Sequence, residues 1–173
     1  MFEKLIELLA GAWSTLRPYE LVEAYNRGVV LRFGRYHRTL APGLHWKWPF
    51  AEDAVSVLAC ITTLPLAPQT LTTQDDVGVV VAAVVKYEIA KPEPYVTDIW
   101  DQRDVLADVT MGAIRKAVSA TKYTDLIAGP PEDRVIELVR KEVNRYGFKI
   151  HAVTFTDLGR VRSLRLIQAQ RSD

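Results

Sequence analysis

The sequence has one cysteine, no long apolar run and almost no net charge. Cys60 alone excludes an internal disulfide and a cysteine-based metal site, and its apolar neighbours predict a small buried side chain. No apolar run reaches the roughly 20 residues of a membrane-spanning helix, so none is expected. A net charge of +1 argues against a dedicated nucleic-acid-binding protein, because such proteins carry a basic excess.

Catalytic motifs are also missing. His37, His45 and His151 fall on separate predicted elements, and their spacing is not typical of a metal or catalytic site. The pair Asp75-Asp76 precedes Val-Gly and predicts a hairpin turn rather than a cation site. No phosphate-binding glycine loop and no nucleophile-elbow serine is present. We therefore expect no catalytic residue, no cofactor and no metal.

What the chain does have is an uneven distribution of charge. Residues 24–51 include no acid, and this stretch is expected to form a basic surface through Arg32, Arg35, Arg38 and Lys47. The balance reverses over residues 98–108, where Arg103 is the single cation among Asp98, Asp101, Asp104 and Asp108. Such a dipolar molecule suits contact either between copies of itself or with an anionic lipid surface. In a contact between copies, we expect the four aspartates to be contact residues.

Aromatic residues interleave with the basic stretch, as they would in a platform for single-stranded nucleic acid. Leu44, Trp46, Trp48 and Phe50 alternate with His45 and Lys47, which predicts one half-buried strand with the aromatic side chains packed in the core. No nucleic-acid partner is therefore expected.

The first 18 residues predict an amphipathic helix that ends at Pro18. Its apolar stripe fits contact with a membrane surface and docking onto protein equally well, and consists of Phe2, Ile6, Leu9, Trp13 and Leu16. The neutral start and Glu7 are unlike a secretory signal. The expectation is a peripheral membrane-associated protein with neither signal peptide nor transmembrane helix.

The remaining pattern predicts an α+β protein large enough to bury a core. Strands are expected over residues 19–25, 28–33, 44–50 and 54–64, followed by a hairpin whose second strand, VVVAAVV, is central because it is apolar on both faces. One helix is expected from Gln102, and a second helix is expected after Pro131 and should end at Gly147. A last strand is expected over residues 148–155. We expect four divisions: an amphipathic N-terminal helix over residues 1–18, a β-rich lobe over 19–90, an α/β lobe over 91–157 and the start of a C-terminal helix over 158–173.

Four segments carry a resemblance to a known family. They are GVVLRFGRYHRTLAPGLHWKWPF at residues 28–50, LTTQDDVGVVVAAVVKYEI at 71–89, AIRKAVSATKYTDLI at 113–127, and NRYGFKIHAVTFTDL at 144–158. In order and spacing the set resembles the SPFH (band 7) domain of stomatin, prohibitin, flotillin and the HflK/HflC proteins, and HflK-like members most of all. Where family members usually begin with a membrane anchor, this sequence offers only the amphipathic start. Where the family tends to carry prolines and a long coiled coil, residues 156–173 have no proline and are too short for heptads to be counted, so the sequence is either a fragment or that of a protein whose assembly does not rest on a coiled coil.

The resemblance implies an antiparallel β-rich lobe, a smaller α/β lobe and the start of a C-terminal helix. It implies a non-enzymatic membrane-associated scaffold that assembles side by side with copies of itself into rings or larger oligomers. Such assemblies organise lipid or regulate membrane proteins, proteases among them. The alternative is a soluble structural or interaction module, a viral one included, that uses the SPFH fold away from membranes.

Overall fold

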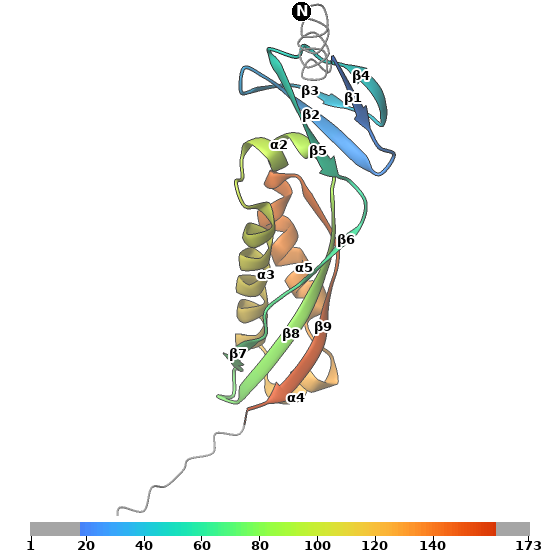
Figure 1. Cartoon of the computed structure of the whole chain (residues 1–173). Helices are drawn as coiled ribbons and strands as arrows, with labels where there is room; N and C mark the ends of the chain where they lie inside the picture. The colour runs from blue at the N-terminus through green and yellow to red at the C-terminus, as the bar shows by residue number, and fades with distance from the viewer. Residues whose placement is uncertain (1–17, 162–173) are drawn as a thin grey trace, which may run out of the picture.

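The computed structural model describes residues 18–161, which form two lobes placed end to end (Figure 1). Antiparallel sheets and several helices confirm the expected α+β class. The N-terminal lobe consists of five short strands: β1 (Tyr19–Val22), β2 (Asn26–Arg32), β3 (Arg35–Leu40), β4 (Gly43–Trp46) and β5 (Glu52–Leu58). They form a two-stranded ribbon, β1-β4, and a three-stranded sheet, β3-β2-β5.

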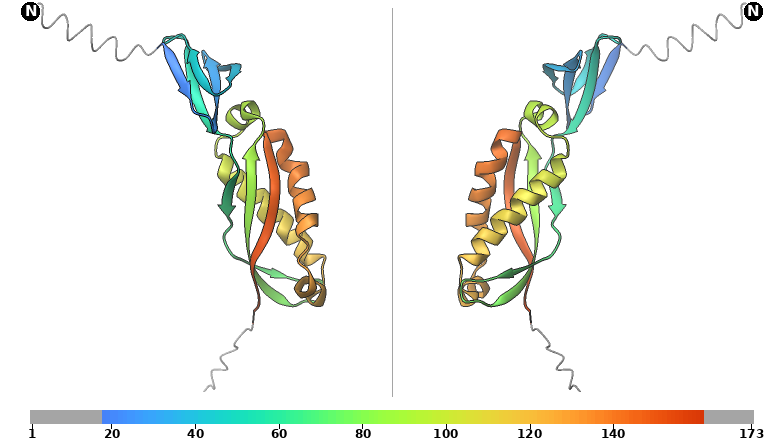
Figure 2. Two further views of the ribbon diagram at one scale, coloured as in Figure 1. Left: turned by 90° about the vertical axis from the view of Figure 1, so that its right-hand side faces the viewer. Right: turned by 90° about the vertical axis from the view of Figure 1, so that its left-hand side faces the viewer.

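The C-terminal lobe is one antiparallel sheet covered by helices. Its strands are β6 (Thr62–Pro65), β7 (Gln69–Thr72), β8 (Gly78–Ile89) and β9 (Phe148–Arg160). Its helices are α2 (Pro92–Thr97), α3 (Gln102–Ser119), α4 (Tyr123–Ala128), α5 (Glu132–Val143) and the 3-10 turn η1 (Asn144–Tyr146). Helices α3 and α5 lie side by side against one face of the sheet (Figure 2).

Strand β8 is central, as the sequence predicted. It pairs with β9 along nearly its whole length, so β6 and β7 share its other edge in tandem. Its buried side chains alternate and face the helices, where they meet the apolar stripes of α3 and α5. Val29 and Val57 of the N-terminal lobe belong to the same buried cluster, so the core continues from one lobe into the other.

The strands group differently from the division expected at residue 90. Residues 54–64 were expected to be one strand, but β5 ends at Leu58 and β6 begins at Thr62 in the other sheet. The sheet that carries the helices therefore takes in residues on both sides of position 90, and the C-terminal lobe is the larger one. Strand β9 runs to Arg160, so the start of the expected final helix is strand, and residues 162–173 lie outside the described part.

The free edge of β9 is covered by side chains of α5. Arg140 donates two hydrogen bonds to the Ile150 carbonyl, at 3.1 and 2.9 Å, and the Glu132 carboxylate accepts from the Phe155 N–H at 3.0 Å. Side chains that occupy the backbone groups of an edge strand block the addition of a further strand. Along this part of β9, strand pairing is therefore not available for contact between copies.

Gly147 supports the turn from η1 into β9. Its φ of +85° lies in the left-handed region, and an added Cβ would collide with the Lys91 carbonyl oxygen. Gly34 has a similar φ of +76° but open space around it. Gly147→Ala should therefore lower the free energy of unfolding by about 3 kcal/mol, against about 1 kcal/mol for Gly34→Ala. If urea denaturation shows the same loss of unfolding free energy in both variants, the collision with the Lys91 carbonyl is not what makes Gly147 necessary.

Candidate functional site

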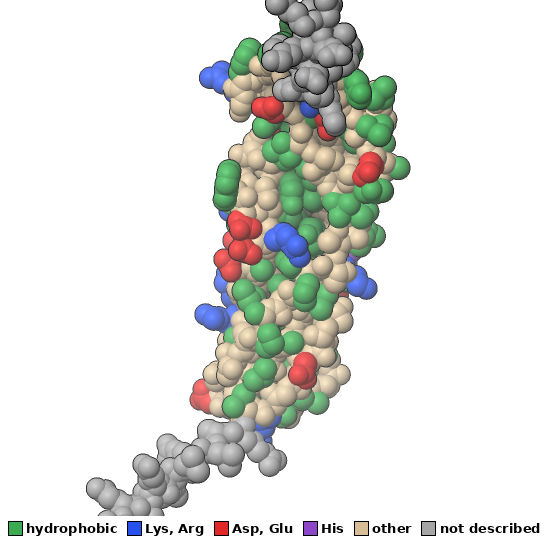
Figure 3. Space-filling model, viewed as in Figure 1, with side chains coloured by type: hydrophobic (Ala, Val, Ile, Leu, Met, Phe, Trp, Pro, Cys, Tyr) green, Lys and Arg blue, Asp and Glu red, His purple; other side chains and the backbone are tan. Residues whose placement is uncertain are grey.

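The β1-β4 ribbon turns an apolar face toward solvent. Antiparallel pairing places Tyr19 opposite Trp46 and Leu21 opposite Leu44, so these four side chains share one face. All four are more than half exposed, because no further layer formed by residues 18–161 covers the ribbon. Hydrophobic side chains accordingly line the right-hand edge of the upper lobe, over β1 and β4, in Figure 3.

Two neighbouring turns extend this surface with further aromatic residues. The Phe33 N–H donates to the Ala51 carbonyl, which joins the β2–β3 turn to the connection between β4 and β5. Phe33, Trp48 and Phe50 are 80%, 62% and 84% exposed. Together with the ribbon face they form a surface that we call the apolar tip: Tyr19, Leu21, Phe33, Leu44, Trp46, Trp48 and Phe50.

This exposure overturns the prediction that the aromatic residues of 44–50 pack in the core. Strand β4 ends at Trp46, and the chain then turns, so Trp48 and Phe50 are not part of the strand. The alternating pattern does mark one face of the ribbon, but no other strand or helix of the described residues packs against that face. Exposed large apolar side chains gathered in one lobe are typical of a contact site for protein or membrane.

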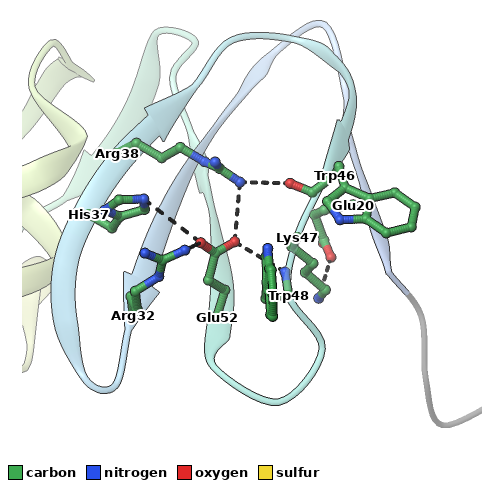
Figure 4. A network of polar contacts seen from close by, with 8 residues as sticks. All are labelled: Glu20, Arg32, His37, Arg38, Trp46, Lys47, Trp48 and Glu52. Carbon is green, nitrogen blue, oxygen red and sulfur yellow. Dashed lines mark hydrogen bonds and ion pairs between the residues drawn. The ribbon is translucent and has the colours of Figure 1, made fainter.

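Beneath the tip lies a buried carboxylate that holds the surrounding loops together (Figure 4). The Glu52 side chain is fully buried and accepts hydrogen bonds from Arg32 at 3.0 Å and Arg38 at 3.2 Å. It also accepts from the Trp48 backbone N–H at 3.2 Å, and His37 lies 3.8 Å away. Strand β5 thus binds β2, β3 and the turn that carries Trp48 through one side chain.

The surroundings of Glu52 determine its charge. Burial favours the neutral acid, but the Trp48 N–H and the Arg38 and Arg32 guanidinium groups together outweigh it and lower the pKa of Glu52 below 4.5. The carboxylate is therefore ionised at neutral pH and balances cations on both sides. Sequence reasoning missed this residue, although a signal was present: Glu52 is the first acid after the acid-free stretch.

The four residues of the predicted basic surface have different surroundings. Arg32 and Arg38 pair with Glu52, and Arg38 also donates to the Trp46 carbonyl at 2.6 Å. Lys47 pairs with Glu20 at 2.8 Å on the ribbon face opposite the tip. Arg35 is exposed and forms no ion pair within the described residues. Their contact with lipid or with another copy stays a prediction.

The acidic residues predicted to contact another copy lie in the other lobe. Asp98 follows α2, Asp101 precedes α3, and Asp104 and Asp108 lie on the first turns of α3. All four are exposed, and none forms an ion pair within residues 18–161. The structure thus keeps them well apart from the basic residues at the tip (Figure 1).

The three histidines do not converge. The His45 ring contacts the Ala41 carbonyl at 2.6 Å, and His151 lies 3.1 Å from Glu88 on the sheet of the other lobe. The Lys149 ammonium, which donates a hydrogen bond to Glu88 at 2.7 Å, and then the nearby His151 lower the pKa of the Glu88 carboxylate. In the described part of the chain, no three His, Cys, Asp or Glu residues gather as metal ligands would.

The pair Asp75-Asp76 forms part of the turn between β7 and β8, as predicted. Asp76 has a φ of +57°. Hydrogen bonds from the Thr73 hydroxyl at 2.6 Å and then from the Tyr123 N–H at 3.0 Å lower the pKa of Asp75. The two acids therefore close the turn and attach it to the start of α4.

Two further sequence expectations concern burial and the membrane. Cys60 is exposed between β5 and β6, so the prediction of a buried thiol was wrong; the apolar run around it is broken by the passage from one sheet to the next. Among residues 18–161, no helix is both long and apolar enough to cross a membrane. The N-terminal stripe from Phe2 to Leu16 lies outside the described residues.

Comparison with known proteins identifies relatives across most of the chain. An uncharacterized protein of Archaeoglobus fulgidus is 28% identical over 160 residues, which cover 91% of this chain and 64% of the relative. Protein HflK of Vibrio cholerae is 32% identical over 144 residues, which cover 83% of this chain and 36% of the relative. The Escherichia coli protein named modulator of FtsH protease HflK is 32% identical over 112 residues, which cover 65% of this chain and 26% of the relative.

The chain thus spans between about a quarter and two thirds of the length of these relatives. The profile of the SPFH domain / Band 7 family matches residues 20–161, which includes both lobes and confirms the resemblance seen in the sequence. The chain therefore belongs to the SPFH domain / Band 7 family.

Proposed function

We propose that this chain is a non-enzymatic scaffold that associates with a membrane through its apolar tip and assembles there with copies of itself. The observation that carries the proposal is the exposure of Trp46, Trp48, Phe50 and their apolar neighbours at one end of the molecule. Tryptophan and tyrosine favour the interface between lipid and water, where their rings contact apolar chains and their polar atoms stay hydrated.

The tip has further properties that suit lipid contact. Two carboxylates of this lobe are neutralised within the protein, Glu52 beneath the tip by two arginines and Glu20 on the opposite ribbon face by Lys47, so these two oppose an anionic headgroup layer only weakly. Arg35 adds an exposed cation at the start of β3. Near an acidic leaflet such a cation contributes about 1 kcal/mol. The connection between β4 and β5 lies at the top of the upper lobe in Figure 1, at the end of the described residues that is farthest from α3 and α5.

The second part of the proposal concerns the partner. The Escherichia coli relative is named as a modulator of FtsH protease. We extend this role to the present chain as regulation of a membrane protein, a protease being the leading candidate. An assembly fixed at the membrane by the tips leaves the helical lobes free to contact such a partner.

Vesicle flotation tests the membrane part. The full chain should float with vesicles of phosphatidylcholine and phosphatidylserine, and less with phosphatidylcholine alone. Deleting residues 1–17 removes the N-terminal apolar stripe and keeps the apolar tip. The truncated chain should therefore retain part of the binding to vesicles. A chain that never floats would leave the soluble interaction module as the better account, and a truncated chain with no binding would assign contact to the N-terminal stripe.

A further inference from the structure

Trp100 lies between α2 and α3 and is 98% exposed, more than any other large apolar side chain in the described residues. Its indole contributes almost nothing to the core. Tryptophan is among the residues most enriched at the energetic centres of protein interfaces, where it fills a pocket on the partner. An exposed tryptophan on a loop of the C-terminal lobe, away from the apolar tip, therefore indicates contact with protein.

Acidic side chains surround Trp100. Asp98 and Asp101 flank it in sequence and Asp104 follows one turn into α3, with Arg103 the single cation among them. Figure 3 shows acidic side chains gathered at the left-hand edge of the molecule, over the first turns of α3. In the part of the chain that the structure describes, none of these aspartates forms an ion pair. A partner surface should therefore offer an apolar pocket with cations around it.

Helices α3 and α5 enclose a groove with these properties, with a volume of about 660 Å³. Its floor is apolar and consists of Val109, Gly112, Ala113 and Leu138. Gly112 is exposed in the middle of α3, and a Cβ added there would meet no atom within 4 Å. A glycine at such a position costs a helix about 1 kcal/mol relative to alanine. The helix gains nothing from this glycine, but its missing side chain lets another molecule approach the helix backbone.

The charged side chains of the groove have a cationic excess. Lys116, Lys141 and Arg145 line it together with Asp108 and Glu142. No ion pair forms among these five within the described residues, although Arg145 stacks on Tyr146 with its guanidinium carbon 4.5 Å from the ring centre. The three cations are thus available to carboxylates brought by another molecule.

We propose that Trp100 of one copy inserts into the α3–α5 groove of the next copy, with the surrounding aspartates facing Lys116, Lys141 and Arg145. The inference rests on the self-association in the proposed function and names the contact that produces it. The start of α3 lies on the side of the lobe away from α5, so the loop and the groove point in different directions (Figure 2). The contact is therefore head-to-tail, which builds rings or filaments rather than closed dimers.

Other surfaces are less suited to this contact. Arg32 and Arg38 at the tip already pair with Glu52, so they are weaker partners for the aspartates than the cations of the groove. The edge of β9 is occupied by Arg140 and Glu132. Within the described residues, Trp100 is not packed in the core and the cations of the groove form no ion pair, so both remain available for contact with another copy.

A pair of variants tests the contact. Trp100→Ala removes the inserted side chain and keeps the groove, whereas Gly112→Phe fills the groove and keeps Trp100. Each alone should raise the protein density needed for assembly on vesicles at least about 30-fold, as measured by the mass of cross-linked species. Gly112→Ala, which adds only a methyl group to the groove, should impair assembly far less than Gly112→Phe does. Urea denaturation should show no loss of stability in Gly112→Phe, because phenylalanine is a better helix former than glycine.

Mixing the two variants gives the sharpest result. Only one productive contact remains possible, between Trp100 of the Gly112→Phe copy and the groove of the Trp100→Ala copy, so the mixture should form 1:1 dimers and no larger species. Full assembly in either single variant, or a mixture that yields no dimer, would overturn this contact while leaving self-association intact. An unaltered chain that stays monomeric on vesicles would instead overturn the proposed function.

Discussion

Replacing Trp46, Trp48 and Phe50 together by serine should weaken binding to anionic vesicles at least ~100-fold, a loss of about 2.7 kcal/mol. Full burial of one large apolar side chain is worth about 1.5–3 kcal/mol, and all three are mainly exposed in the folded chain. For the same reason the substitutions should leave the free energy of unfolding within about 0.5 kcal/mol of its original value. Flotation and urea denaturation measure the two effects separately.

The matched control is Trp100→Ala, which removes a similar exposed tryptophan from the other lobe. In vesicle flotation at low protein density, this variant should bind as the unaltered chain does. If it loses as much binding as the triple variant, exposed aromatic residues act without regard to position, and the apolar tip is not the membrane contact.

Replacing Glu52 by glutamine should lower the free energy of unfolding by about 2–4 kcal/mol. Removal of one partner from a buried ion pair leaves the other charges without compensation, which costs about 3–5 kcal/mol when all are buried. The lower range applies here because Arg32 and Arg38 are about two fifths exposed and remain partly hydrated. The control Glu20→Gln, which breaks the partly exposed pair with Lys47, should cost no more than about 1 kcal/mol, because both groups of this pair still reach solvent.

The pH dependence of this difference follows from the direction of the pKa shift. The pKa of Glu52 is lower in the folded chain than its ordinary value of 4.5, so the unfolded chain takes up the proton first. The stabilisation by Glu52 is therefore fully present above about pH 4.5 and decreases as the pH falls through the folded-state pKa. In urea denaturation, the gap between the unaltered chain and Glu52→Gln should narrow in that acidic range. A gap that widens toward acid would contradict the assigned charge.

Much of the C-terminal lobe could be predicted from the sequence because its signals are local. The two-faced apolar run of β8, the stripes of α3 and α5, and Gly147 after η1 each correspond to what the structure shows. The break between β5 and β6 could not be predicted, since the run around Cys60 has no glycine or proline to mark it.

The candidate site was harder to predict because its exposure depends on whether another layer of the protein packs against it. Alternation in residues 44–50 marks a face of a strand, but it does not say whether another layer lies against that face. Among the strands of residues 18–161, β4 pairs with β1 alone, so Leu44 and Trp46 are exposed on one face of a two-stranded ribbon. Glu52 and its arginines are far apart in sequence, and their convergence depends on the β2–β3 and β2–β5 pairings.

The measurement that tests the central claim most directly is cross-linking of the full chain after flotation with phosphatidylcholine–phosphatidylserine vesicles. The account predicts that the floated fraction yields species well beyond dimers, and that the triple variant of Trp46, Trp48 and Phe50 yields neither flotation nor these species. A chain that remains monomeric on the vesicles at every protein density, or one that never floats, would contradict the account of a membrane-bound, self-assembling scaffold.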